Sequence, residues 1–169
     1  MNIRIQDIDE QGLDVDFVED ESWGTDLPPH ERVLATLRVA RSGEFIRVQG
    51  TLKTILKLVC SRCLAVYDFP IDVPVDSTLV PASRFDEEES KELTGEDMDL
   101  RTYEGEEFNV DEIISENIVL MLPIKPLCRE DCKGICPTCG ADKNRETCAC
   151  EKIPVDDRFS ILQKLKFDK

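Results

Sequence analysis

The 169-residue sequence lacks most of the side chains from which active sites are built. Histidine occurs once, at His30, so neither a Ser/His/Asp triad nor a histidine-rich catalytic metal site is available. The sequence also contains no G-x-x-x-x-G-K-S/T loop and no G-x-G-x-x-G motif, which bind phosphates and dinucleotides. These absences predict a protein that is not an enzyme and has no small-molecule substrate. Since nothing near His30 in the sequence completes a site, we expect it on the surface.

Long apolar runs and aromatic residues are also scarce. No run of eighteen apolar residues occurs, so we expect no membrane span. The first ten residues are polar and acidic, without the apolar stretch of a signal peptide, so we expect a cytoplasmic protein. Aromatic residues make up 6 % of the chain, which argues against binding single strands by base stacking. Cytoplasmic thiols stay reduced, so closely spaced cysteines there bind metal more often than they form disulfides.

The net charge of −15 is unevenly distributed along the chain. Residues 1–31 contain ten acids and one base, and residues 85–112 contain thirteen acids and two bases. Between them, residues 32–67 contain seven bases and one acid, while residues 124–169 contain ten bases and eight acids. The total disfavours non-specific binding to nucleic acid or anionic membranes, whereas the local basic segment permits specific phosphate contacts.

Six of the eight cysteines lie close together near the C-terminal end, with the spacing C-x3-C-x3-C-x2-C-x8-C-x-C: Cys128, Cys132, Cys136, Cys139, Cys148 and Cys150. The C-P-T-C-G sequence at 136–140 favours a tight turn that brings two thiolates to one metal and points backbone N–H groups at the sulfurs. Cys148 and Cys150 can supply the other two ligands. We therefore predict a closed, structural zinc site, whose metal contributes roughly 10 kcal/mol or more to folding.

The other cysteines leave several arrangements open. Cys128 and Cys132 can replace one pair of the predicted site, or they can meet the upstream Cys60 and Cys63 in a second site. Cys60 and Cys63 can also be two reduced thiols that hold a hairpin turn. A redox role for this C-x-x-C pair is a further alternative, although it does not open a helix in a βαβ unit as the thioredoxin pattern requires.

Hydrophobic periodicity predicts an α+β fold. Alternating apolar residues from 33 to 80 predict an antiparallel meander, with a hairpin turn at 41–44, a bulge or bend at Gly50 and a second turn at 60–63. Residues 110–122 have a helical stripe, capped by Asn109 with Glu112 completing a capping box and ended by Pro123. This helix should cover the meander or partly closed sheet.

The remaining segments have weaker patterns. We expect a short strand at 2–8, a loop or irregular arm at 9–31 and a mobile acidic loop at about 85–107. Asp157 can cap a short terminal helix that carries Phe159, Leu162 and Leu165. Residues 1–123 then form the sheet-and-helix domain. Residues 124–169 form the zinc-binding segment with the terminal helix packed on it.

Basic residues on the polar parity of the strands form a candidate nucleic-acid surface. This set comprises Arg32, Arg38, Arg47, Lys53, Lys57 and Arg62, to which Lys133, Lys143 and Arg145 in the cysteine-rich loop add. An ordinary solvated sheet face explains the strand residues equally well. The acidic segments 1–31 and 85–112 could instead hold a basic protein.

Three segments together carry a resemblance to a known family: C-S-R-C-L at 60–64, the helix with L-M-L-P-I at 120–124, and the run from Cys128 to Cys150 followed by Asp157, Arg158 and Leu162. The chain resembles the YceD-like family of large ribosomal RNA subunit accumulation proteins. The resemblance implies a non-enzymatic role in ribosome biogenesis, in the accumulation or processing of large-subunit ribosomal RNA. The partner would be precursor rRNA, a basic large-subunit ribosomal protein, or both. The competing hypotheses are a thiol redox or metal-handling protein and a zinc-stabilised interaction module.

Overall fold

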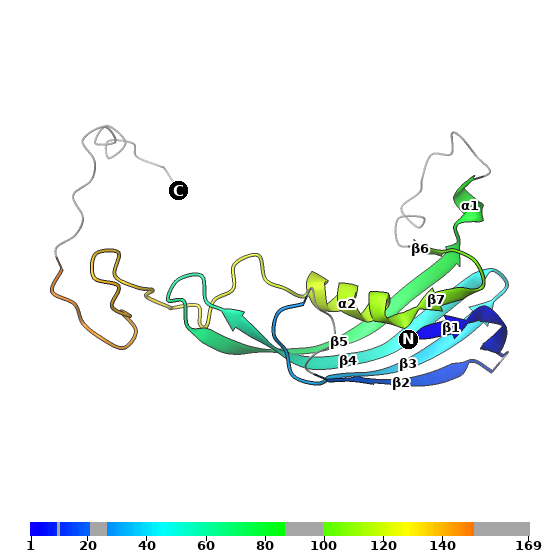
Figure 1. The fold of residues 1–169 in the computed structure, drawn as a ribbon, viewed down its shortest axis with the longest axis horizontal. Helices are drawn as coiled ribbons and strands as arrows, with labels where there is room; N and C mark the ends of the chain where they lie inside the picture. The colour runs from blue at the N-terminus through cyan, green and yellow to red at the C-terminus, as the bar shows by residue number, and fades with distance from the viewer. Residues whose placement is uncertain (10, 21–26, 87–99, 151–169) are drawn as a thin grey trace, which may run out of the picture.

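The computed structural model describes residues 1–9, 11–20, 27–86 and 100–150. Its centre is a five-stranded sheet with the order β2-β3-β4-β5-β6, in which only the β5–β6 pair is parallel (Figure 1). The strands are β2 (Leu13–Glu19), β3 (Val33–Ser42), β4 (Phe45–Val59), β5 (Val66–Pro81) and β6 (Leu100–Tyr103). A separate ribbon pairs β1 (Asn2–Arg4) with β7 (Glu107–Asn109). The helices are η1 (Ile5–Asp7, 3-10), α1 (Ser83–Asp86) and α2 (Val110–Leu120).

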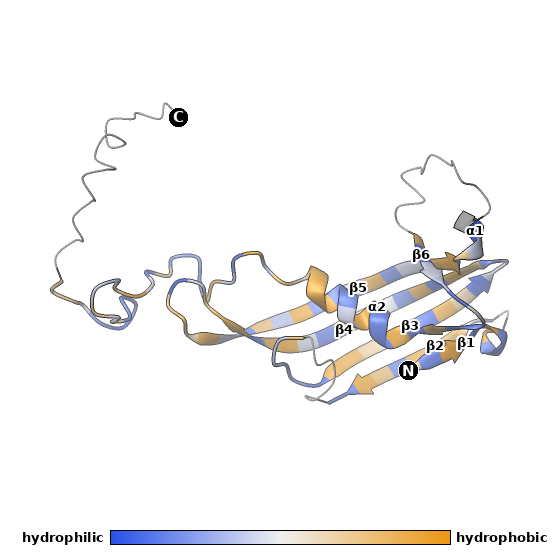
Figure 2. Ribbon diagram, turned by 45° about the horizontal axis from the view of Figure 1, so that its top comes forward, coloured by the Kyte–Doolittle hydropathy of each residue, from blue (hydrophilic) through white to orange (hydrophobic). Residues whose placement is uncertain are grey.

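The sheet forms because its strands alternate apolar and polar side chains with a period of two (Figure 2). In β3, Val33, Ala35, Leu37 and Val39 are buried, and the residues between them are exposed. The even-numbered positions of β4 from Ile46 to Leu58 continue the same buried face, with the exception of Gly50. Each fully buried Val, Leu or Ile side chain contributes about 1.5–3 kcal/mol, so this face fixes the register. The predicted meander and its hairpin turn are confirmed.

Helix α2 covers the apolar face of the sheet (Figure 1). It begins where predicted, because the Asn109 side chain accepts a hydrogen bond from the Asp111 backbone N–H at 2.8 Å. Its buried residues are Val110, Ile113, Ile114 and Ile118. The α+β class, with a mostly antiparallel sheet covered by a helix, is confirmed.

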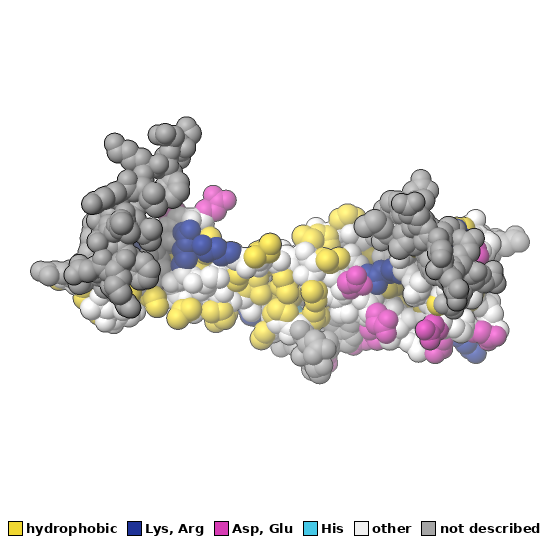
Figure 3. All heavy atoms as spheres, turned by 90° about the horizontal axis from the view of Figure 1, so that it is seen from above, with side chains coloured by type: hydrophobic (Ala, Val, Ile, Leu, Met, Phe, Trp, Pro, Cys, Tyr) yellow, Lys and Arg dark blue, Asp and Glu magenta, His cyan; other side chains and the backbone are white. Residues whose placement is uncertain are grey.

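The β4–β5 hairpin extends beyond the neighbouring strands, and the cysteine-rich segment lies at its far end (Figure 1). Seen from the α2 side, hydrophobic side chains gather between α2 and the cysteine-rich segment (Figure 3). No helix in the part of the chain that the structure describes has the length and apolar character needed to cross a bilayer.

Of the bulge or bend predicted at Gly50, the structure excludes the bulge. The ladder passes through it without interruption, pairing Gly50 with Leu37 on one side and Val75 on the other. A Cβ at this position would lie 2.0 Å from the Thr36 carbonyl oxygen. Glycine is therefore required by the close approach of β3, not by a change in register.

Several other predictions were wrong. The segment 9–31 is not a loop, since it contains β2, and β6 occupies part of the predicted acidic loop. The short strand predicted at 2–8 is present but shorter than predicted, since it covers Asn2–Arg4 and η1 follows it. His30 is buried, with 6 % of its surface exposed, because residues 29–31 pair with the backbone of β4. The predicted terminal helix at Asp157 lies outside the described residues.

Candidate functional site

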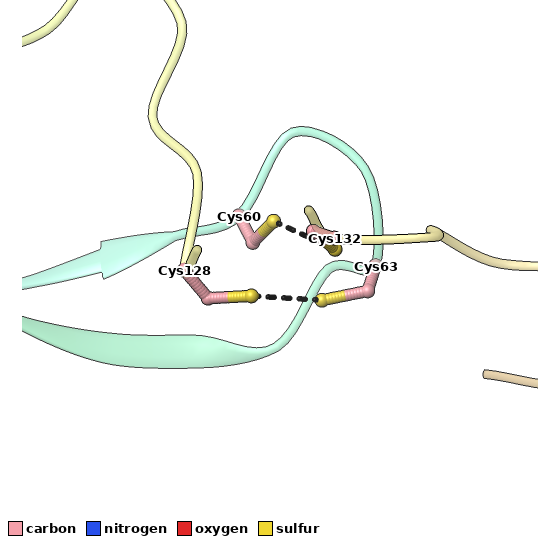
Figure 4. Close-up of side chains that lie close together, drawn as sticks. All are labelled: Cys60, Cys63, Cys128 and Cys132. Atoms are coloured by element: carbon pink, nitrogen blue, oxygen red, sulfur yellow. Dashed lines mark hydrogen bonds between the residues drawn. The ribbon is translucent and has the colours of Figure 1, made fainter. Parts of the chain in front are cut away.

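Four cysteines from two distant parts of the chain form a first cluster. Cys60 and Cys63 lie at the β4–β5 connection, and Cys128 and Cys132 lie in the segment after α2. All four sulfurs are within 4.8 Å of one another. The Cys60 and Cys132 sulfurs are 3.8 Å apart, and those of Cys63 and Cys128 are 3.7 Å apart (Figure 4). Of the arrangements that the sequence left open, the structure has the one in which Cys128 and Cys132 meet the upstream Cys60 and Cys63.

Backbone hydrogen bonds hold the connection that carries Cys60 and Cys63. The Leu64 N–H donates to the Cys60 carbonyl at 2.9 Å, and Leu64 adopts a positive φ of 59° that closes the turn. The Ser61 N–H donates to the Pro126 carbonyl at 2.8 Å, which fixes the incoming segment. Arg62, a predicted nucleic-acid contact, donates instead to the carbonyls of Glu130 and Cys132 at 3.0 and 2.8 Å. The first cluster therefore ties the C-terminal segment to the sheet.

The second cluster contains Cys136, Cys139, Cys148 and Cys150, the set favoured by the sequence. These sulfurs also lie within 4.8 Å of one another. The Gly140 N–H donates to the Cys136 carbonyl at 2.8 Å, and Gly140 has a φ of +75°, which is the tight turn expected after a C-P-T-C sequence. Cys139 and Cys150 are exposed, whereas Cys136 is buried.

Each cluster contains thiols with opposite pKa shifts. Backbone hydrogen bonds from Cys128 and Cys63 lower the pKa of Cys60 to about 6, and those from Cys139 and Thr138 lower the pKa of Cys136 to about 6. Burial, reinforced by the neighbouring thiols, raises the pKa of Cys128 to about 12. The thiol of Cys139, followed by burial, raises the pKa of Cys150 to about 12. All four thiols of a cluster can therefore be thiolates together only with a bound cation that balances their charge.

The donor set fits zinc. All eight ligands are thiols, and a tetrahedron with Zn–S bonds of about 2.3 Å separates its sulfurs by about 3.8 Å, close to the distances in the first cluster. A disulfide would instead bring two sulfurs to about 2.05 Å, and the eight cysteines are all free. Four thiolates complete the coordination of zinc and leave no position for a water, so such a site stabilises structure and does not hydrolyse substrates.

Asn144, in the loop of the second cluster, was missed by the sequence analysis. Its side-chain amide donates to the Cys132 sulfur at 3.3 Å. Its carbonyl oxygen accepts from the Lys133 N–H and from the Arg129 guanidinium, both at 2.8 Å. The spacing of the cysteines contains no signal for this residue, because its role depends on how the two clusters fold together.

The candidate nucleic-acid residues of the sheet lie beside carboxylates. Arg38 pairs with Asp14 at 3.1 Å, Arg47 with Asp76 at 2.9 Å and Lys53 with Asp72 at 3.0 Å. Lys57 pairs with Asp68 at 2.6 Å and with Glu31 at 3.4 Å. Arg32 is exposed just before β3, and Lys133, Lys143 and Arg145 are exposed in the cysteine-rich segment. The strand cations therefore form cross-strand ion pairs and not a continuous basic face.

A family model described as "Large ribosomal RNA subunit accumulation protein YceD" matches residues 48–166. This range includes both cysteine clusters, and the resemblance drawn from the sequence is confirmed. Two Arabidopsis thaliana proteins, named large ribosomal RNA subunit accumulation protein YCED homologs 1 and 2, chloroplastic, are similar to 83 % of the chain, at 25 % and 29 % identity.

These matches cover 50 % and 61 % of the two plant proteins. An uncharacterized protein of Mycobacterium tuberculosis is 33 % identical over 104 residues, which are 62 % of this chain and 48 % of that protein. The chain thus spans about half the length of the curated relatives it matches. No solved structure matches the chain.

Proposed function

The chain belongs to the YceD family of large ribosomal RNA subunit accumulation proteins, and from this premise we propose that it is a non-enzymatic ribosome biogenesis factor. Its role is to support accumulation or processing of large-subunit rRNA in the cytoplasm. The names of the plant relatives support the connection with this RNA. The closed thiol clusters support a role in binding and not in catalysis. With four thiolate ligands, a bound metal would have no free coordination position for a water, and neither cluster contains a base for hydrolysis.

Zinc is the metal that the two clusters suit best, and its role would be structural. In the first cluster, metal bonds would join the β4–β5 hairpin to the segment after α2. In the second, they would hold the loop of residues 136–150. Cys136 is the one buried residue of this loop. A segment of this kind gains its folding free energy from the metal and not from a core of its own.

The partner supported best is a basic large-subunit ribosomal protein. The observation that carries this choice is the ion pairing of the sheet cations Arg38, Arg47, Lys53 and Lys57 with carboxylates. Phosphate binding depends on cations that release counterions from RNA, and cations already beside carboxylates contribute little of this free energy. Precursor rRNA is the second candidate, favoured by the exposed Arg32, Lys133 and Lys143.

Two measurements test the proposal. Depletion of the protein in its host should lower the ratio of large- to small-subunit rRNA, and an unchanged ratio would overturn the proposed role. Titration of precursor rRNA at several salt concentrations then separates the partners, because direct RNA binding must weaken steeply as salt rises.

Alkylation of the native protein tests the redox alternative. A closed zinc site protects its thiolates, so we expect slow labelling of both clusters and fast labelling after chelation. Rapid labelling of the untreated protein would support the redox or metal-handling hypothesis.

A further inference from the structure

The C-terminal end of α2 and the residues after it expose several large apolar side chains. Val119 is 49 % exposed, Leu120 72 %, Met121 40 % and Ile124 106 %. These four residues form what we call the apolar patch. On the α2 side of the molecule, hydrophobic side chains gather between α2 and the cysteine-rich segment (Figure 3). The core does not need these residues, because α2 packs on the sheet through Ile113, Ile114 and Ile118.

Acidic residues lie next to the apolar patch on the same helix. Glu112, Glu116 and Leu120 are spaced four residues apart, so they follow one another along one exposed ridge of α2. Glu116 also pairs with Arg101 of β6. Ahead of the helix, Glu104, Glu106 and Glu107 are all exposed. The ridge therefore changes from acidic to apolar along its length.

The combination of an acidic surface and an adjoining apolar patch restricts the kind of molecule that can bind. An exposed apolar cluster marks a docking site, while the neighbouring carboxylates repel phosphates and anionic lipid headgroups. RNA would also need exposed aromatic rings or a cluster of cations, whereas the patch consists of aliphatic side chains and Met121, with Lys125 as the exposed cation that directly follows Ile124. A polypeptide that places large apolar side chains on the patch and Lys or Arg beside the glutamates matches both halves.

We propose that the apolar patch and the adjacent Glu112 ridge form the docking site for a basic segment of a large-subunit ribosomal protein, with apolar anchors on Leu120 and Ile124. This inference rests on the proposed function for the identity of the partner. It goes beyond that function by assigning a surface. It also assigns a recognition mode, in which apolar burial supplies affinity and charge sets orientation.

Site-specific photocrosslinking in cells tests the surface. The full chain carries p-benzoylphenylalanine at position 120 or 124, or at the control position 18. Val18 is 57 % exposed on β2, so it is as accessible as the patch without being part of it. We expect positions 120 and 124, but not 18, to crosslink to one basic large-subunit ribosomal protein.

Four other results would overturn the docking proposal. These are crosslinks to RNA, to a second copy of the chain, to residues 151–169 of the same chain, or no crosslink above the level at position 18.

Binding affinities measured with purified components then test the apolar patch and the acidic ridge separately. The double substitution Leu120→Lys, Ile124→Lys should weaken binding of the crosslinked ribosomal protein by about tenfold or more, with an unchanged melting temperature because both side chains are exposed. Glu112→Lys should weaken binding at low salt and have less effect at high salt. Equal affinity of the double variant and the wild type would contradict the proposal.

The same variants in the host separate this proposal from the proposed function. If depletion lowers large-subunit rRNA but the Leu120→Lys, Ile124→Lys variant restores it fully, the docking site is wrong and the function stands. If depletion leaves the rRNA unchanged, the function itself fails.

Discussion

The side-chain amide of Asn144, in the loop of the second cluster, donates a hydrogen bond across 3.3 Å to the sulfur of Cys132 in the first cluster. The same side chain accepts hydrogen bonds from the Lys133 N–H and the Arg129 guanidinium. Its backbone N–H donates to the Asp142 carboxylate at 2.9 Å, which fixes the loop that presents it. A metal that orders the second loop would thereby place an N–H donor against a ligand of the first site, which couples the two.

We predict that Asn144→Asp weakens metal binding at the first cluster by about 10- to 100-fold, the usual effect of losing an outer-shell partner. The substitution keeps the size of the side chain but replaces the N–H donor by a carboxylate oxygen that repels the Cys132 thiolate. Metal release to a chelator, followed optically with cobalt in place of zinc, measures the effect. One of the two metals should leave faster than in the wild type.

Lys143→Ala is the matched control, because Lys143 is the exposed neighbour of Asn144 in the same loop. Its two metals should leave as they do in the wild type. Equal release rates in the Asn144→Asp variant would show that the contact with Cys132 does not tune the site.

Single cysteine substitutions should remove one metal at a time. Cys60→Ser disrupts the first cluster, and Cys148→Ser the second. If the wild type binds one zinc at each cluster, as proposed, each variant should retain about one. The sheet should remain folded in both, because its buried face from Val33 to Leu79 does not depend on the cysteines. Elemental analysis counts the metal, and far-ultraviolet circular dichroism follows the sheet. Loss of both metals in either variant would indicate one cooperative unit.

The elements whose structure depends on local pattern could be predicted from the sequence. Val33, Leu37 and Val39 alternate with polar residues, and Asn109 precedes a stripe of apolar residues with helical spacing. Residues close in the sequence are therefore enough to predict β3 and α2. Strand β2 has the same alternation in Leu13, Val15 and Phe17, but acidic residues separate them, and an acidic segment is also typical of a loop. Strand β6 is four residues long and parallel to β5, too short for its pattern to stand out.

The partners of Cys60 and Cys63 could not be chosen from the sequence, for a different reason. The C-x2-C spacing brings Cys136 and Cys139 together locally, so their part in one site followed from the sequence. The contacts of Cys60 with Cys132 and of Cys63 with Cys128 span 72 and 65 residues. Only the path of the chain over the sheet, from β5 through α2, returns these residues to the hairpin. Asn144 depends on the same long-range arrangement.

The ion pairs of the sheet face predict a pH-dependent effect. The Arg47 guanidinium, through a hydrogen bond and its charge, lowers the pKa of Asp76. A lowered carboxyl pKa stabilises the fold above the unfolded value of about 3.9, and this contribution is lost as pH falls through the folded pKa. Arg47→Gln should therefore lower the melting temperature slightly at pH 6 and by less near pH 3, below the unfolded pKa of the carboxyl group.

Arg41→Gln is the control for this pair, because the Arg41 guanidinium contacts the Gly43 carbonyl oxygen at 3.1 Å and its contact does not titrate. Any effect of this variant on the melting temperature should not depend on the protonation of a carboxylate. If Arg47→Gln lowers the melting temperature equally at both pH values, the pair with Asp76 does not stabilise the fold.

Gly50 and Gly43 offer a test of why glycine occurs in the central hairpin. Alanine at position 50 would place its Cβ 2.0 Å from the Thr36 carbonyl oxygen, within the backbone of a paired strand that cannot move without breaking the ladder. We expect Gly50→Ala to destabilise the protein by about 3 kcal/mol, the upper part of the range for overpacking. At position 43 an added Cβ meets nothing within 4 Å, and only the positive φ of 64° opposes it. Gly43→Ala should therefore lower stability by about 1 kcal/mol. Urea unfolding measures the free energy of unfolding of both variants. Equal losses of stability would show that β3 moves away from position 50 without cost.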